Sequence, residues 1–341
     1  MMIGKRKAVS RREVLIGAGT LALAGCSRGG GGGSSPTSEP LYRISLAQWS
    51  LHRRLFGGGW RDAVASLGGD EFRTVLRNEP ERLLRGEMSN LDFPVVARRE
   101  FGIDAVEYVN SFFFDKAEDE AYLNELNARA NGEGVRNLLI MCDNEGHLGD
   151  PDAALREQAV IDHSKWLHAA AALGCHCIRV DASSTGTPDE QLNLVADGLH
   201  ALCDRADSVG IDVVVENHGG ISSNGSWVAS LIRAVDHPRL GTLPDFGNFN
   251  ISETERYDPY LGIEEMMPFA KAVSAKSYDF DDTGDETTLD YRRLLRTVVE
   301  SGYRGYVGIE YEGNRLSEAD GIRATHALVE RVREELASEI A

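Results

Sequence analysis

Seven charged residues recur along the chain at intervals of 29 to 38 residues, each close to the end of a short apolar run. They are Glu107, Asp143, Asp181, Glu216, Asp245, Lys276 and Glu310. Confining the three acids Glu216, Asp245 and Glu310 in one narrow site is costly unless a cation or protons balance their charge. A single acid could serve only to hydrogen-bond loop amides, but the set indicates a shared site for a divalent ion. The oxygen-rich donors favour Mn²⁺ or Mg²⁺, with Zn²⁺ or Co²⁺ as alternatives.

Eight runs rich in valine and isoleucine are predicted to be strands, and amphipathic stretches at helical spacing separate them. Repeated alternation of strand and helix favours parallel strands joined by right-handed crossovers. The fold class is therefore α/β, a single (β/α)8 TIM barrel over residues 41–338. The predicted strands cover residues 42–48, 103–109, 135–142, 175–181, 211–217, 240–246, 272–278 and 305–311.

A closed parallel barrel gathers the carboxyl ends of its strands into one ring, where active sites of this architecture lie. The stretch "DVVVENHGG" illustrates the arrangement: its valines suit the barrel wall, and residues 216–218 suit the rim of the pocket. The interval between Gln48 and Glu107 is about twice the length of one strand–helix unit. We expect extra helices there, packed around the barrel or over its mouth.

The amino-terminal 40 residues differ in composition from the rest. Residues 1–26 contain a twin arginine (Arg11, Arg12), an apolar run from Val14 to Gly25, and Cys26. The run is shorter than the roughly 20 residues that span a bilayer, so we expect an export signal. The signal resembles the twin-arginine and lipoprotein types, with Cys26 as the lipidated residue. Residues 27–40, rich in glycine and serine, are predicted to be a flexible linker.

The whole chain carries a formal net charge of −18. Such a surface repels phosphates and argues against nucleic acid as a partner. We expect an exported protein, periplasmic or at the cell surface, that meets the membrane only through its lipid anchor. The export route and the absence of a P-loop in the sequence favour a substrate without phosphate.

Six motifs together resemble the sugar phosphate isomerase/epimerase family of the xylose isomerase-like TIM barrels, over about residues 41–338. The resemblance implies a divalent metal held by Glu, Asp, His and Glu from strands five to eight, with Glu216, Asp245 and Glu310 as the first, second and fourth ligands. It also implies that Glu216 and Glu310 form the acid–base pair. The motifs are "LLIMCDNEGHLGD", "LGCHCIRVDA", "VVVENHGGISSNGSW", "GTLPDFGNF", "VSAKSYDFD" and "YVGIEYEG".

The third ligand departs from the family, because Ser274 and Lys276 stand where relatives commonly have His-x-Lys. Three outcomes are open. His218 supplies the nitrogen ligand, since it shares the side-chain direction of Glu216 if the strand continues; water fills the position; or the Lys276 ammonium replaces the metal. Asn248 stands where relatives often have a histidine that touches substrate.

Such a site suits proton transfer at a carbon next to a carbonyl, through an enediolate. The expected protein is an isomerase or epimerase of a free sugar or keto-sugar, in which Lys276 neutralises oxyanion charge. Alternatives are a lyase that eliminates from 3-keto-glycosides, and a non-catalytic sugar-binding lipoprotein. The family resemblance also implies a homo-oligomer, for which the sequence carries no interface signal. Residues equally suited to substrate binding or to a structural role are Asp143, Glu145, His147, Asp181 and Trp227.

Overall fold

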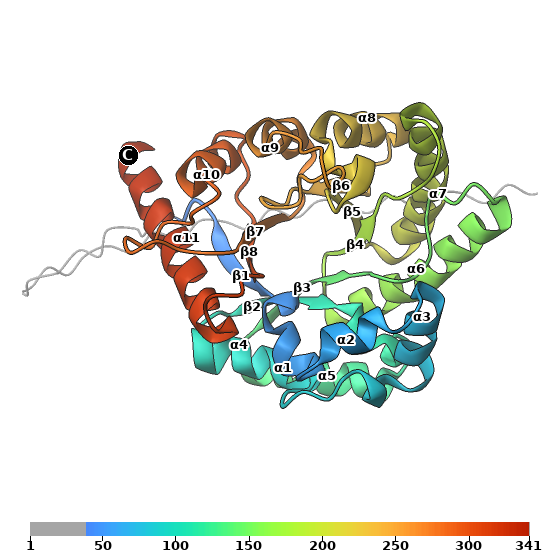
Figure 1. Ribbon diagram of the computed structural model, residues 1–341, viewed down its shortest axis with the longest axis horizontal. Helices are drawn as coiled ribbons and strands as arrows, with labels where there is room; N and C mark the ends of the chain where they lie inside the picture. The colour runs from blue at the N-terminus through green and yellow to red at the C-terminus, as the bar shows by residue number, and fades with distance from the viewer. Residues whose placement is uncertain (1–38, 341) are drawn as a thin grey trace, which may run out of the picture. The chain divides into compact units, whose positions relative to one another are not determined.

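The computed structural model describes residues 39–340, and residues 41–340 form an eight-stranded parallel barrel surrounded by helices (Figure 1). The predicted signal, linker and lipidation site fall almost entirely outside the described residues. The strands are β1 (Arg43–Ala47), β2 (Ala105–Val109), β3 (Arg136–Met141), β4 (Cys177–Asp181), β5 (Asp212–Glu216), β6 (Leu240–Leu243), β7 (Val273–Ser277) and β8 (Tyr306–Tyr311).

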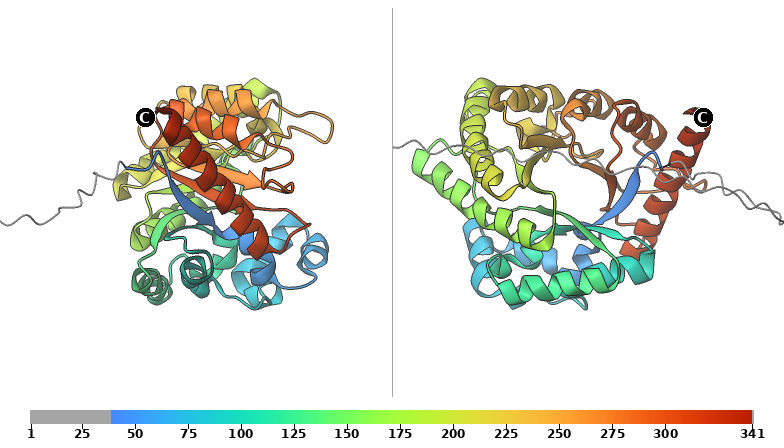
Figure 2. Two further views of the ribbon diagram at one scale, coloured as in Figure 1. Left: turned by 90° about the vertical axis from the view of Figure 1, so that its left-hand side faces the viewer. Right: turned by 180° about the vertical axis from the view of Figure 1, so that it is seen from behind.

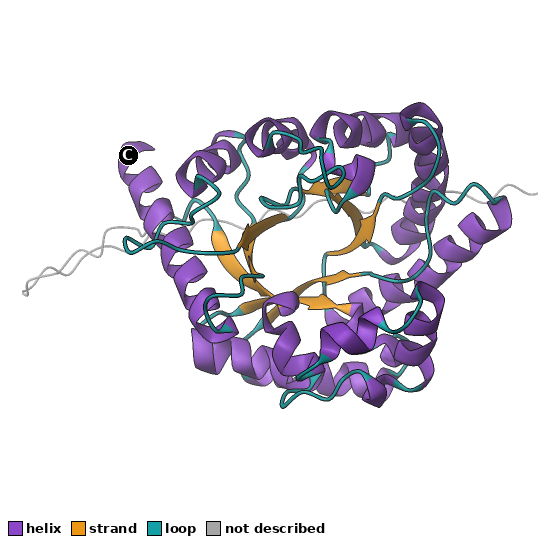
Figure 3. Ribbon diagram, in the orientation of Figure 1, coloured by secondary structure: helices purple, strands orange, loops and turns teal. Residues whose placement is uncertain are grey.

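All eight predicted strands are confirmed, and their order in the sheet is β6-β5-β4-β3-β2-β1-β8-β7. Strands β6 and β7, which stand at the two ends of this order, meet through the segment that follows β6. There the Phe246 N–H donates to the Ser274 carbonyl, and the Ser274 N–H donates to the Pro244 carbonyl, each at 3.0 Å. These bonds close the cylinder visible in Figure 3 and bring the segment after β6 against β7.

The wall of the barrel is apolar because helices cover the outside of parallel strands and side chains fill the inside. Val213, Val214 and Val215 are all 0% exposed, which explains the valine run of β5. The principal outer helices are α4 (Phe93–Phe101), α5 (Glu120–Gly132), α6 (Ala153–Leu173), α7 (Pro188–Val209), α8 (Gly225–Val235), α9 (Pro259–Met266), α10 (Tyr291–Glu300) and α11 (Glu318–Ile340).

The long interval after β1 contains the predicted extra helices. It begins with the 3-10 helix η1 (Gln48–Leu51) and continues with α1 (His52–Phe56), α2 (Trp60–Ala65) and α3 (Gly69–Asn78). Figure 2 shows these helices, in blue, on the side of the barrel where the loops after the strands project. The described residues contain no helix long and apolar enough to cross a lipid bilayer.

Candidate active site

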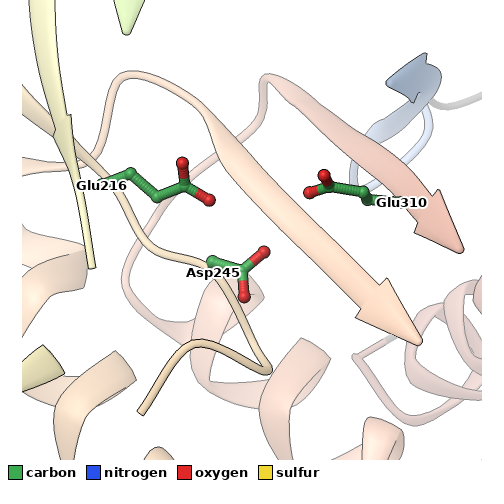
Figure 4. Close-up of side chains that lie close together, drawn as sticks. All are labelled: Glu216, Asp245 and Glu310. Carbon is green, nitrogen blue, oxygen red and sulfur yellow. The ribbon is translucent and has the colours of Figure 1, made fainter. Parts of the chain in front are cut away.

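Three buried carboxylates converge at the carboxyl ends of the strands (Figure 4). Glu216 is the last residue of β5, Asp245 follows β6 by two residues, and Glu310 lies in β8. Their exposed fractions are 1%, 0% and 4%. Each offers an oxygen, and these oxygens all lie within 4.8 Å of one another. The structure thus brings together three residues that are far apart in the sequence, as their spacing predicts.

The spacing of these oxygens fits a shared divalent cation. Oxygen ligands bind Mg²⁺ or Ca²⁺ at about 2.0–2.6 Å, so two oxygens on one ion are separated by no more than about 4–5 Å. Three buried negative groups also require balancing positive charge, which a bound cation would help to supply. The carboxylates of Glu216, Asp245 and Glu310 could therefore hold a metal ion.

The backbone after β5 and β6 positions Asp245. The side chain of Asn217, which is 0% exposed, donates to the Asp245 carbonyl at 2.9 Å and accepts from the Asp245 N–H at 2.8 Å. The N–H groups of Gly247 and Asn248 donate to Asp245 Oδ1 at 2.8 and 2.9 Å. Asn217, which the sequence places at the rim of the pocket without a role of its own, is a positioning residue.

Ser274 occupies the place between two of the carboxylates. Its Oγ donates to Asp245 Oδ2 at 2.6 Å and lies 3.2 Å from Glu310 Oε2. A hydroxyl has one proton to donate, so it cannot satisfy both carboxylates at once. With Ser274 in this place, the side chains able to ligate a metal here offer oxygen atoms.

Lys276 supplies a buried positive charge beside Glu310. Its Nζ lies 3.6 Å from Glu310 Oε2 and 3.3 Å from Glu312 Oε1. Burial alone lowers the pKa of Lys276, but the negative charges of Glu310 and Asp245 outweigh it and hold the pKa well above its ordinary value. The side chain is therefore an ammonium ion that faces the carboxylates.

Arg179 of β4 is a second buried cation, which the sequence analysis missed. It is 4% exposed, and its Nε lies 2.5 Å from Glu216 Oε2. One terminal nitrogen lies 2.7 Å from Asp143 Oδ1 and 3.2 Å from Asp181 Oδ1. A signal was available in the motif "CIRVD", because alternate residues of a strand share a face and Asp181 was expected to face the pocket.

The two glutamates have raised pKa values for the same reason but face different cations. Burial raises the pKa of Glu310 to about 8, and Lys276 opposes the shift. Burial also raises the pKa of Glu216, and Arg179 opposes it. Carboxyl groups with raised pKa values can hold and release protons during a reaction.

The structure does not bring His218 to the three carboxylates. Strand β5 ends at Glu216, so the alternation that would have carried His218 to the same face stops. Its Nδ1 instead lies 3.0 Å from Asp181 Oδ1, and the side chain is 38% exposed. His218 therefore belongs to a charged rim formed with Asp181 and Arg179.

This pair predicts a pH-dependent stability. The Asp181 carboxylate raises the pKa of His218 to about 9. Because this folded-state value exceeds the unfolded value of about 6.5, the stabilisation is complete below about pH 6.5 and is lost as the pH rises through about 9. Allowing for screening of the exposed imidazole, we expect His218→Gln to lower the free energy of unfolding by about 1 kcal/mol at pH 6. Urea titrations at pH 6 and pH 10 should show a smaller loss at pH 10, and an equal loss at both would contradict this role.

Three further predicted substrate-binding residues lie at the site. Asn248 Nδ2 lies 3.3 Å from Glu216 Oε1. Asp143 and Asp181 each form an ion pair with Arg179, and Arg179 in turn forms an ion pair with Glu216. Burial raises the pKa of Asp181, but the charges of His218 and Arg179 outweigh it and hold the pKa well below its ordinary value.

The remaining candidates have other contacts. Glu145 is buried and lies 2.6 Å from both Trp166 Nε1 and Lys165 Nζ. Trp227 is 7% exposed and donates to the Pro188 carbonyl at 3.1 Å. Exposed His147 has its Nδ1 2.7 Å from Ser183 Oγ. The contacts of Glu145 and Trp227 hold helices α6 and α8 in place.

Comparison with known proteins identifies the family to which the barrel belongs. Residues 95–332 match the family model described as xylose isomerase-like TIM barrel. The chain belongs to this family. The predicted family resemblance and barrel fold are thereby confirmed.

One curated relative and two solved structures show the range of the similarity. A 77-residue stretch is 40% identical to the alpha subunit of a C-glycoside deglycosidase from Arthrobacter globiformis, and the match covers 21% of this chain and 22% of the relative. The chain thus spans about a fifth of that relative's length.

Among solved structures, a 3-keto-D-glucoside 4-epimerase from E. coli is 17% identical with a TM-score of 0.59, covering 85% of this chain and 99% of that chain. A family member from Mycobacterium smegmatis in complex with magnesium is 18% identical with a TM-score of 0.59, covering 86% of this chain and 97% of that chain. At these identities the structural likeness shows the shared fold.

Proposed function

We propose that this protein is a metal-dependent isomerase or epimerase that moves a proton at a carbon next to the carbonyl of a keto-sugar. The observation that carries the proposal is the convergence of Glu216, Asp245 and Glu310 within 4.8 Å, with two of the three on separate strands. Two glutamates at one carbon can remove a proton from one face and return a proton to the other, which inverts the carbon.

The residues that would hold the metal are Glu216, Asp245 and Glu310, and this all-oxygen ligand set favours Mg²⁺ or Mn²⁺. When bound, such an ion polarises a carbonyl oxygen and stabilises the negative charge that follows proton loss. The Lys276 ammonium adds a fixed positive charge beside Glu310. The side chains of Asn248, Asp181 and Asp143 would orient substrate hydroxyls.

The test is proton exchange. Methyl 3-keto-β-D-glucopyranoside incubated in D₂O with the Mn²⁺-loaded protein should gain deuterium beside the carbonyl and yield an epimer, as followed by NMR. Treatment with EDTA should stop the exchange, and added Mn²⁺ should restore it. D-Fructose serves as the free ketose in the same assay. Absence of exchange with both sugars would count against the proposal.

A lyase is the second candidate. The 40% sequence identity over 77 residues with a C-glycoside deglycosidase subunit favours it. One glutamate would take the C2 proton of a 3-keto-glycoside, a C1–C2 double bond would form, and the glycosidic oxygen would leave C1 with a proton donated by the other carboxyl group. Elimination would release methanol from the methyl glycoside, whereas epimerisation keeps the glycosidic bond. A non-catalytic sugar-binding protein would bind the glycoside with neither outcome.

The identity of the metal leads to a further prediction. Replacing Ser274 with His would place a nitrogen donor between Asp245 and Glu310. We expect Ser274→His to raise the affinity for Zn²⁺ relative to the affinity for Mg²⁺, because imidazole suits Zn²⁺ and oxygen ligands suit Mg²⁺. Calorimetric titrations with each ion measure the ratio of affinities, and Ser274→Ala is the control that should leave this ratio as in the wild-type protein. An unchanged ratio in Ser274→His would contradict the placement of the ion.

Export and lipidation at Cys26 remain part of the proposal. They rest on the sequence of residues 1–40 and would give the protein access to sugars outside the cytoplasm. Membrane fractionation of the wild-type protein and of a Cys26→Ser variant tests the anchor. The variant should lose its association with the membrane, because serine at this position cannot carry the lipid.

A further inference from the structure

Strand β1 is shorter than its two neighbours at its carboxyl end. Its backbone pairs with β2 only as far as Ala47 and with β8 only as far as Leu46, which lies opposite Ile309. Strand β2 continues to Val109, and β8 continues to Tyr311. Because the chain after β1 turns into η1, its backbone no longer pairs with the ends of these neighbours. Buried N–H and C=O groups at those ends need other partners.

Two side chains of η1 take the place of the missing strand backbone. On one side, Gln48 Oε1 accepts from the Val109 N–H at 2.9 Å. On the other side, Ser50 Oγ accepts from the Tyr311 N–H at 2.9 Å and donates to the Ile309 carbonyl at 3.2 Å. Gln48 and Ser50 are both 0% exposed. The 3-10 helix therefore holds the ends of β2 and β8 through side chains.

The two hydrogen bonds of Ser50 lie on either side of a proposed acid–base residue. The Ile309 carbonyl belongs to the peptide group before the Cα of Glu310, and the Tyr311 N–H belongs to the peptide group after it. One hydroxyl thus holds both of the planar groups whose orientation sets φ and ψ at Glu310. On the other edge of β8, backbone pairing with β7 places Lys276 opposite Glu310. Since side-chain direction follows the strand backbone, Ser50 helps to direct the Glu310 carboxylate.

We propose that Ser50 is a positioning residue for Glu310. It fixes the backbone on both sides of this glutamate and so keeps the carboxylate within 4.8 Å of the oxygens of Glu216 and Asp245. A displacement of about 1 Å at a reacting group can lower a rate by about 10²-fold, so this constraint acts on the chemistry as well as on stability. The inference rests on the proposed function, because the acid–base role of Glu310 is part of it.

Ser50→Ala tests the role, because it removes the hydroxyl and leaves both peptide groups without this partner. Proton exchange into methyl 3-keto-β-D-glucopyranoside is measured in D₂O at saturating Mn²⁺. We expect kcat to fall roughly ten- to a hundred-fold with little change in KM, the pattern of an interaction that acts in the transition state.

The matched control is Tyr42→Phe, which removes another buried hydroxyl. Tyr42 is 0% exposed, precedes β1 at the opposite end of the barrel, and donates to the Val329 carbonyl at 2.8 Å. Its loss also removes a buried hydrogen bond, but far from the carboxylates, so kcat should stay at the wild-type value. The comparison separates a general loss of stability from a displacement of Glu310.

Mn²⁺ affinity, measured by calorimetry, gives a second result that does not depend on turnover. Because Glu310 is also a proposed ligand, we expect Ser50→Ala to weaken Mn²⁺ binding roughly ten-fold, and Tyr42→Phe to leave it unchanged. If Ser50→Ala does not fold, Ser50→Cys replaces it. A thiol is a weak donor and a weak acceptor, so this variant should show the same changes to a smaller degree.

Equal kcat in the wild-type protein and Ser50→Ala, or equal losses in Ser50→Ala and Tyr42→Phe, would overturn the role of Ser50 and leave the proposed function in place. Weaker Mn²⁺ binding in Ser50→Ala alone, with no proton exchange by the wild-type protein, would remove the proposed function and retain the role of Ser50. No exchange by the wild-type protein and unchanged Mn²⁺ binding in Ser50→Ala would remove both.

Discussion

Replacing Glu310 with Gln, or Glu216 with Gln, is expected to lower kcat by roughly 10²–10⁴-fold, the usual contribution of one general acid or base. Glutamine is nearly isosteric with glutamate but cannot take up a proton at the same position. Burial raises the pKa of both glutamates, that of Glu310 to about 8, which favours proton exchange by these groups. Incorporation of deuterium from D₂O into the keto-sugar measures the effect directly.

The control is Glu300→Gln, which removes an exposed carboxylate at the end of α10. It should exchange protons at the wild-type rate. Each site variant should also be checked for bound metal, since Glu216 and Glu310 are proposed ligands as well as acid–base groups. Full exchange in both Glu216→Gln and Glu310→Gln would remove the proposed mechanism.

Replacing Arg179 with Met is expected to have the largest effect on stability, a loss of about 3–5 kcal/mol in the free energy of unfolding at pH 7. The substitution keeps much of the side-chain volume but leaves Glu216, Asp143 and Asp181 without the cation that contacts all three. Breaking a buried ion pair on one side leaves uncompensated charge, which is why the cost exceeds that of a surface pair.

The loss should depend on pH in a definite direction. The pKa of Asp181 is held below its ordinary value in the folded protein, so its contribution is present above the unfolded pKa of about 3.9 and disappears as the pH falls further. Chemical unfolding of wild type and Arg179→Met should therefore converge at acid pH. Arg179→Lys, which keeps the charge, should lose less. A neutral effect of Arg179→Met at pH 7 would show that these carboxylates do not need the cation.

The barrel could be predicted because its physical pattern is local. Runs such as Val213–Val215 are apolar throughout, since parallel strands are buried on both faces, and glycines end the helices between them. The convergence of Glu216, Asp245 and Glu310 also followed from the sequence, because one strand–helix unit returns the chain to the same end of the barrel.

The side-chain partners could not be predicted in the same way. His218 was expected to continue the alternation of β5, but the strand ends at Glu216 and the imidazole lies against Asp181. Glu145 follows β3 closely, yet its carboxylate lies against Trp166 of α6. Such outcomes depend on where a strand ends and how a loop turns, and neither has a periodic signal in the sequence.

A crystal of the protein soaked in Mn²⁺, with anomalous scattering recorded at the manganese edge, tests the central claim most directly. We predict one anomalous peak within about 2.0–2.6 Å of carboxylate oxygens from Glu216, Asp245 and Glu310, the range of oxygen ligands to such ions. A peak elsewhere, or no peak at a Mn²⁺ concentration that supports turnover, would contradict a metal centre formed by these three residues.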